Sequence, residues 1–203
     1  LLQDSWTRRR NISLIDPNTI INVGGNNPDT SSLKNAFASA NSGDTILVYG
    51  LQGSELTFLD VGDRSFDDGN PVHIYFMNPM EIGEGTWNGM DVMRIYGVEN
   101  VVFDGMDNLK LVAGPVEPGT SLSPRDLIFV GGSYGAVRNV VVKNMELDGR
   151  FYNVDGSYWN SNGAKWGVKG NEVTNFAACN LYVHNIREQH GFYFNVADEN
   201  LEF

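Results

Sequence analysis

Asn139-Val-Val-Val142 is the stretch that decides the fold, because an asparagine followed by a short apolar run recurs along the chain. The other copies are Asn100-Val-Val-Phe103, Asn180-Leu-Tyr-Val183 and Asn200-Leu-Glu-Phe203. The apolar runs are typical of β-strands, and asparagine tolerates the left-handed backbone of a tight turn. Asparagines stacked on neighbouring strands can also hydrogen-bond to one another. We therefore expect all four phrases to lie side by side in one column of a repeating structure.

The spacing of the repeat predicts a solenoid of short parallel strands. The last interval, from Asn180 to Asn200, is 20 residues long, which suits one coil of three short strands. The two earlier intervals are 39 and 41 residues long and contain polar, glycine-rich inserts at residues 113–125 and 148–170. We interpret these inserts as loops leaving single coils. The alternative is one additional, degenerate coil in each interval.

A short amphipathic helix is expected over residues 31–40, capped by Thr30 or Ser31, and Gly43 precedes a strand over residues 44–49. Residues 32–48, S-L-K-N-A-F-A-S-A-N-S-G-D-T-I-L-V, resemble the helix cap and first strand of pectin-lyase-like β-helix proteins. The resemblance covers residues 31–203 and implies an all-β fold, a right-handed parallel β-helix with a short N-terminal capping α-helix. Such proteins are often secreted or at the cell surface and act on polysaccharides; the family also includes adhesins and phage tailspikes.

Two segments follow from this interpretation: an N-terminal extension over residues 1–30 and a parallel β-helix domain over residues 31–203. The sequence stops at Phe203 inside a predicted strand. Because an open parallel edge tends to pair with another strand, we expect a C-terminally truncated domain or a protein partner covering the open C-terminal end.

The composition limits the partners. With 41% hydrophobic residues the chain is long enough to bury a core, and its formal charge of −11 argues against nucleic acid as a partner. No apolar run approaches the roughly 20 residues of a membrane span. The lone Cys179 excludes an internal disulfide. A folded protein with a polysaccharide or other glycan as partner is the remaining expectation.

Strand alternation predicts which side chains point outward. In the last two copies of the phrase, the residue between the two apolar ones is Tyr182 or Glu202, so this position is expected to face solvent. The predicted outward columns are Val102, Val141, Tyr182 and Glu202; then Asp104, Lys143 and His184; then Asp107, Glu146 and Arg187.

Five charged or titratable residues of these columns are candidate catalytic groups: Asp104, Lys143, Glu146, His184 and Arg187. In a polysaccharide lyase, Lys143 or His184 would remove a proton and Arg187 would neutralise a uronate carboxylate. In a glycoside hydrolase, Asp104 or Asp107 would act with Glu146. The alternative is a ladder of opposite charges on a solvated face, which has no catalytic role.

The longer insert and its surroundings predict substrate binding, because aromatic faces stack on sugar rings. The candidate substrate-binding residues are Arg150, Tyr152, Tyr158, Trp159, Lys165, Trp166 and Tyr182. The alternative is that these rings pack back onto the strands as a satellite core.

Calcium is the one candidate cofactor. The acidic stretch 60–70 offers Asp63, Asp67 and Asp68 as metal ligands, although it lacks the spacing of a calcium-binding loop and is also compatible with a plain turn. The phrases typical of pectate lyases and polygalacturonases are absent, so no catalytic residue carries over from the resemblance. The sequence favours an extracellular carbohydrate-interacting β-helix, part of a polysaccharide lyase or glycoside hydrolase. The alternative is a non-catalytic structural or adhesive solenoid.

Overall fold

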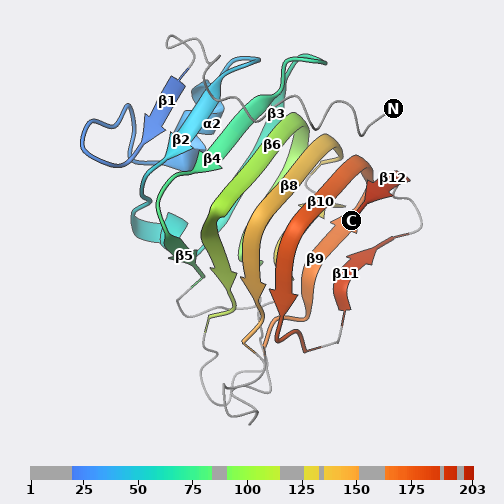
Figure 1. Ribbon diagram of the computed structural model, residues 1–203. Helices are drawn as coiled ribbons and strands as arrows, with labels where there is room; N and C mark the ends of the chain where they lie inside the picture. Colours follow the sequence, from blue (N-terminus) through green and yellow to red (C-terminus); the bar gives the residue numbers. More distant parts are fainter. Residues whose placement is uncertain are drawn as a thin grey trace.

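The computed structural model is mostly β, with one large parallel sheet and one short α-helix (Figure 1). It describes residues 20–83, 91–114, 126–132, 135–150, 163–187, 190–195 and 199–203. Within this part of the chain, no helix has the length and apolar character that a membrane span requires.

The elements are β-strands of very different length, with one α-helix and one 3-10 helix near the N-terminal end of the sheet. In order they are β1 (Ile20–Val23), α2 (Leu33–Ser39), β2 (Thr45–Val48), the 3-10 helix η3 (Gly53–Leu56), β3 (Leu59–Ser65), β4 (Val72–Phe76), β5 (Met80–Ile82), β6 (Met93–Val112), β7 (Asp126–Gly131), β8 (Val137–Asp148), β9 (Trp166–Asn171), β10 (Val173–His184), β11 (His190–Phe194) and β12 (Glu199–Glu202).

Parallel pairing arranges the strands in three rows, because β6, β8 and β10 each bend and contribute to more than one row. Row A runs through β1, β2, β4, the central part of β6 and the first halves of β8 and β10 to β12. Row B joins β5 to the last residues of β6, β8 and β10. Row C joins β3, the start of β6, β7, β9 and β11.

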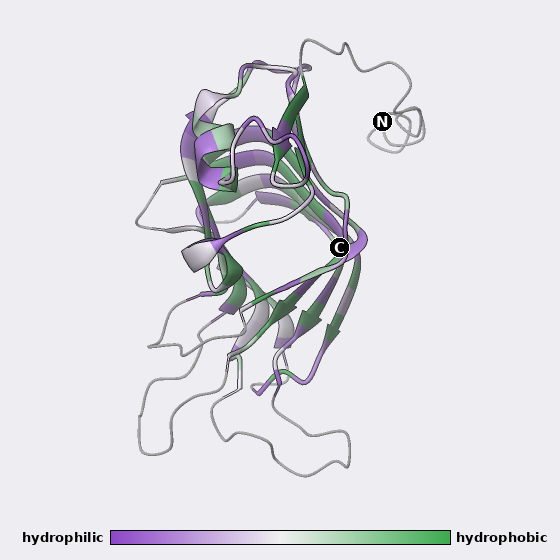
Figure 2. Cartoon of the chain, turned by 90° about the vertical axis from the view of Figure 1, so that its left-hand side faces the viewer, coloured by the Kyte–Doolittle hydropathy of each residue, from purple (hydrophilic) through white to green (hydrophobic). Residues whose placement is uncertain are grey.

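Alternate residues of all three rows point into one hydrophobic core. Phe103 and Val142 from row A, Leu147 from row B and Val130 from row C are each fully buried. Figure 2 shows hydrophobic and hydrophilic residues interspersed along the strands, as a sheet with one buried face requires. The polar residues that alternate with the core positions therefore form the outer faces of the rows.

The expected helix is present, but its cap differs from the prediction. Ser32, not Thr30 or Ser31, is the N-cap, and its hydroxyl accepts a hydrogen bond from the Asn35 amide (3.2 Å). The carboxylate of Glu55 accepts hydrogen bonds from the backbone amides of Leu33 (3.0 Å) and Lys34 (2.9 Å). Glu55 lies in η3, so its contribution could not be inferred from the local sequence of the helix.

Asparagine side chains form ladders at the corners between rows. In the first ladder, Asn100 donates to Asp68 (3.1 Å) and Asn139 donates to Asn100 (2.9 Å). Asn175 then donates to Asn139 and Asn200 to Asn175, each over 2.8 Å. Each of these four asparagines has a positive φ, between 52° and 61°. The predicted asparagine column is thus confirmed for Asn100, Asn139 and Asn200.

The prediction was wrong for Asn180, which belongs to a second ladder. Asn144 donates to Asp104 (2.7 Å), and Asn180 donates to Asn144 (2.9 Å). The misassignment arose because both corners carry the same phrase: Asn144-Met-Glu-Leu147 repeats the pattern of Asn139-Val-Val-Val142. Asn175, which precedes a weaker apolar run, occupies the place given to Asn180.

The pairing also decides between loops and additional coils. Val101 pairs directly with Val140, and Val140 with Phe176, so no further strand of row A lies between them. The alternative of an additional coil is therefore wrong, while residues 115–125 and 151–162 of the two predicted inserts lie outside the described residues. β9 begins at Trp166, inside the segment 148–170 that was predicted as an insert. At the other end, β1 places residues 20–23 in the sheet, within the segment 1–30 that was expected to be an extension.

The second ladder provides a stability test. Asn144→Ala removes two side-chain hydrogen bonds and places alanine, which tolerates the left-handed region less well than asparagine, at a φ of 56°. We expect a loss of about 2–3 kcal/mol in the free energy of unfolding, measured by urea denaturation. Asn144→Gly loses the same two hydrogen bonds, but glycine adopts a positive φ without strain, so its free energy of unfolding should fall less than that of Asn144→Ala. Equal losses in the two variants would contradict a backbone contribution.

Candidate functional site

The outer face of row B carries the densest group of charged side chains. Its register places Glu81, Lys110, Glu146 and Tyr182 in one column. Two residues further along the strands, Asp148 pairs with His184. Because residues i and i+2 of a strand share a face, the two columns lie side by side near the ends of β6, β8 and β10.

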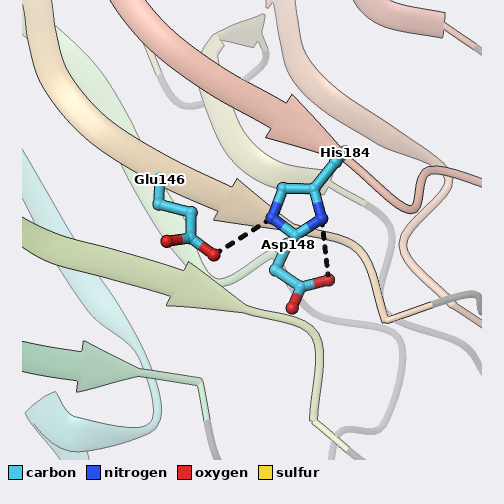
Figure 3. Close-up of side chains that lie close together, drawn as sticks. All are labelled: Glu146, Asp148 and His184. Atoms are coloured by element: carbon cyan, nitrogen blue, oxygen red, sulfur yellow. Dashed lines mark hydrogen bonds and ion pairs between the residues drawn. The ribbon is translucent and has the colours of Figure 1, made fainter. Parts of the chain in front are cut away.

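Lys110, Glu146, Asp148 and His184 form one connected network, called here the His184 cluster. Lys110 Nζ lies 3.0 Å from Glu146 Oε1 and 3.4 Å from Asp148 Oδ2. His184 Nε2 lies 3.0 Å from the same Glu146 oxygen, and His184 Nδ1 lies 3.8 Å from Asp148 Oδ1. Figure 3 shows the imidazole ring between the two carboxylates.

Asp148 is positioned by the backbone turn that follows it. Its Oδ1 accepts hydrogen bonds from the Arg150 amide and from Asn185 Nδ2, both over 2.9 Å. Gly149 is required in this turn, because a Cβ there would lie 2.3 Å from the carbonyl oxygen of Asn185. The aspartate that organises this turn therefore also supplies a charged group to the cluster.

The carboxylates of the His184 cluster are held in their ionised form. Burial by itself would raise the pKa of Glu146, but hydrogen bonds from Lys110 and His184 outweigh it and lower the pKa. Burial likewise opposes the hydrogen bonds from Asn185 and the Arg150 amide to Asp148, yet its pKa is lowered. For Lys110, burial is outweighed by Glu146 and Asp148, so its pKa is raised and the ammonium persists.

The cluster has the donor set of a metal site, but an internal cation already pairs with two of its three possible ligands. One ligand atom each from Glu146, Asp148 and His184 lies within 4.8 Å of the others. Lys110 Nζ contacts both carboxylates, so a metal ion would have to displace the ammonium group. The arrangement therefore favours an internally neutralised network over a metal centre.

An exposed aromatic ring borders the cluster. Tyr182 stacks on the His184 ring, with centroids 4.5 Å apart and an interplanar angle of 26°. The tyrosine is 66% exposed, the highest value among the exposed large hydrophobic residues described. His184 supports the ring from one side and leaves it accessible to solvent.

The predicted placement of the catalytic candidates is partly wrong. Lys143 and Asp104 do come together, with Nζ 3.0 Å from Oδ2. His184 is not in their column, however, because Lys143 pairs with Cys179 and His184 pairs with Asp148.

Burial and the charge of Glu202 raise the pKa of the Cys179 thiol, which is therefore a poor nucleophile.

The third predicted column is also wrong. Glu146 lies between Lys110 and Tyr182, not between Asp107 and Arg187. Asp107 falls in the irregularity of β6 between Asp104 and Leu109, and Arg187 follows the end of β10, where its amide donates to the Ala164 carbonyl over 2.9 Å. The irregularity shifts the register, so counting on from Asn100 wrongly pairs Asp107 with Glu146. Arg187 was misplaced because Asn180 belongs to the second ladder.

The substrate-binding candidates separate into two places. Tyr182 lies on row B, where Arg150 forms an ion pair with Glu81 at the edge of the cluster. Lys165 and Trp166 lie at the start of β9 on row C. Tyr152, Tyr158 and Trp159 lie outside the described residues.

The calcium candidates do not form a ligand set among the described residues, where the three-residue group with suitable geometry is the one around His184. Asp68 instead begins the first asparagine ladder. Asp63 lies in β3 with φ of 57°, and the amide of Asp67 donates to the Ser42 hydroxyl over 2.9 Å. The stretch 60–70 is thus organised by turns and ladder contacts.

Sequence reasoning missed Lys110 and Asp148, although strand alternation in Glu146-Leu-Asp148 places both carboxylates on one face.

Comparisons with protein-family models, with curated proteins and with solved structures find no match for this chain. Its function has to be argued from the geometry of the described residues.

The lowered pKa values predict acid sensitivity. Carboxylates whose folded pKa is lowered stabilise the fold above their unfolded pKa, and this contribution is lost as the pH falls below about 4. Measured by thermal melts, the loss on acidification should be smaller in E146Q/D148N than in the parent chain. The control E99Q/E199Q changes two carboxylates outside the cluster and should follow the parent; identical acid profiles for all three proteins would contradict the prediction.

Proposed function

We propose that the three rows are the faces of a right-handed parallel β-helix, with α2 covering its N-terminal end. Three observations support this architecture. Each row is parallel throughout, the chain passes from row C to A to B within β6, and buried residues from all three rows meet in one core. The N-terminal resemblance to pectin-lyase-like proteins points the same way.

On this architecture we propose an extracellular or cell-surface function in binding an extended glycan along the outer face of row B. The observation that carries the proposal is the exposed Tyr182 ring stacked on His184 beside the His184 cluster. An aromatic ring offers a stacking surface to a sugar, and fixed carboxylate and ammonium groups accept and donate hydrogen bonds to hydroxyls. A row of parallel strands provides a straight face that suits a linear polymer.

The charge state of the cluster favours binding over hydrolysis. A glycoside hydrolase needs one carboxyl group with a raised pKa to protonate the leaving oxygen. In the His184 cluster the pKa of both carboxyl groups is lowered instead. Glu146 and Asp148 therefore act as permanent anions that orient sugar hydroxyls.

Tyr182→Ala tests the binding proposal. Loss of the stacking surface should weaken binding to the best ligand of a polysaccharide panel by about tenfold, measured by affinity electrophoresis or calorimetry, with an unchanged melting temperature. Tyr75→Ala is the matched control, because Tyr75 forms a similar stacked pair with His73 on row A, with centroids 5.9 Å apart. If neither the parent chain nor its variants bind any polysaccharide, the proposal is wrong.

A second candidate function is a lyase acting on a uronate polymer, favoured by the position of His184. The imidazole lies between two carboxylates that orient it, and a substrate carboxylate would have to compete with Glu146 for the Lys110 ammonium. In that case the chain should release unsaturated ends that absorb near 235 nm, and His184→Gln should abolish them while His73→Gln does not. Absence of such products across uronate polymers would exclude this candidate.

A further inference from the structure

Row C carries a different outer surface, in which cations alternate with aromatic rings. Its register places Arg94, Phe129, Lys169 and Tyr193 in one column. Lys169 Nζ lies 5.7 Å from the ring centroid of Phe129 and 4.3 Å from that of Trp166. The ammonium group of Lys169 is thus held between two aromatic rings of neighbouring strands.

A second ammonium group lies on the same indole. Lys165 Nζ is 4.1 Å from the Trp166 centroid, and the indole stacks on Tyr193 with centroids 5.0 Å apart and an interplanar angle of 21°. Lys165, Trp166, Lys169 and Tyr193 are called here the row C patch. Tyr193 is 42% exposed, so its ring is the solvent-facing part of the patch.

The two lysines of the row C patch differ from the other lysines of the chain in their partners. Lys34, Lys110 and Lys143 each have a carboxylate oxygen within 4.0 Å. Among the described residues, Lys165 and Lys169 have no carboxylate at that distance, and their recorded contacts are with aromatic rings. Two ammonium groups have therefore been placed on one indole, without a counter-ion from this part of a chain whose net charge is −11.

Such an arrangement is suited to an external anion. Two like charges held close together raise the local positive potential, and an anion that approaches them relieves their repulsion. The cation–π contacts orient both ammonium groups without neutralising them. The adjacent Tyr193 ring offers a sugar the same kind of stacking surface that Tyr182 offers on row B.

The row C patch adjoins the His184 cluster. The Ala164 amide donates to the Gly149 carbonyl (3.0 Å), so Lys165 and Trp166 begin next to the residue that follows Asp148. In Figure 1 the ends of β8 and β10 and the beginnings of β9 and β11 lie at the same lower edge of the sheet. The two places are thus linked through the backbone at this edge.

We propose that the row C patch is a subsite for anionic substituents of the glycan, with Lys165 and Lys169 binding a carboxylate or sulfate group and Tyr193 stacking on the sugar that carries it. This inference rests on the proposed function, because it takes the ligand to be a glycan. It adds that the glycan is negatively charged and that the preference arises on row C.

Matched polymers separate charge from backbone. Binding of the 203-residue chain is compared between dextran and dextran sulfate, and between fully methyl-esterified and unesterified polygalacturonate. The parent chain should prefer the charged member of at least one pair by about tenfold, and K165Q/K169Q should lose that preference. K165R/K169R should retain it, because the charges remain.

The control K34Q/R138Q removes two positive charges elsewhere, from side chains that are 66% and 62% exposed, and should bind as the parent does. A parent chain without preference for either charged polymer, or a preference that survives K165Q/K169Q, would overturn the inference. The proposed function is tested by a different variant: it is wrong if Tyr182→Ala leaves binding to every polymer unchanged. Melting temperatures of all variants confirm that they are folded.

Discussion

The fixed register between parallel strands is the constraint on which the rest of this structure depends. A slip of one residue would turn every core side chain outward, so the register has to be specified at more than one point. Burial of alternate residues specifies it along the strands. At the corners, asparagine ladders specify it a second time, since each amide donates to a residue at the same corner of the neighbouring strand. The left-handed conformation that asparagine accepts and the hydrogen bond that it makes are both needed at these corners.

The same corners organise the candidate site. Asp104 and Asp148 each accept a hydrogen bond from an asparagine of the next strand, each accepts a backbone amide two residues ahead, and each is followed by a glycine. Asp104 pairs with Lys143, whereas Asp148 pairs with Lys110 and approaches His184. The aspartates that stabilise these turns thus also supply negative charge on the outer face.

Charge is distributed unequally over the outer faces. On row B, cations and carboxylates alternate, so Lys110 and Glu146 neutralise each other before any ligand arrives. On row C, the lysines lie over aromatic rings and keep their charge available. The first surface suits recognition of hydroxyl groups through oriented polar atoms, and the second suits attraction of an anion. A glycan ligand that spans the shared edge would meet both kinds of recognition.

The sequence by itself determined the strands, the repeat, the short helix before the first long strand and the parallel arrangement, because these follow from local apolar patterns and turn residues. It also indicated Glu146, His184 and Tyr182 as outward residues. Only the tertiary structure decided which of them meet. The register depends on the irregularity of β6 between Asp104 and Leu109, and two corners with the same asparagine phrase are indistinguishable in sequence. The clusters around His184 and Trp166 are long-range consequences of that register, so no local pattern could specify them.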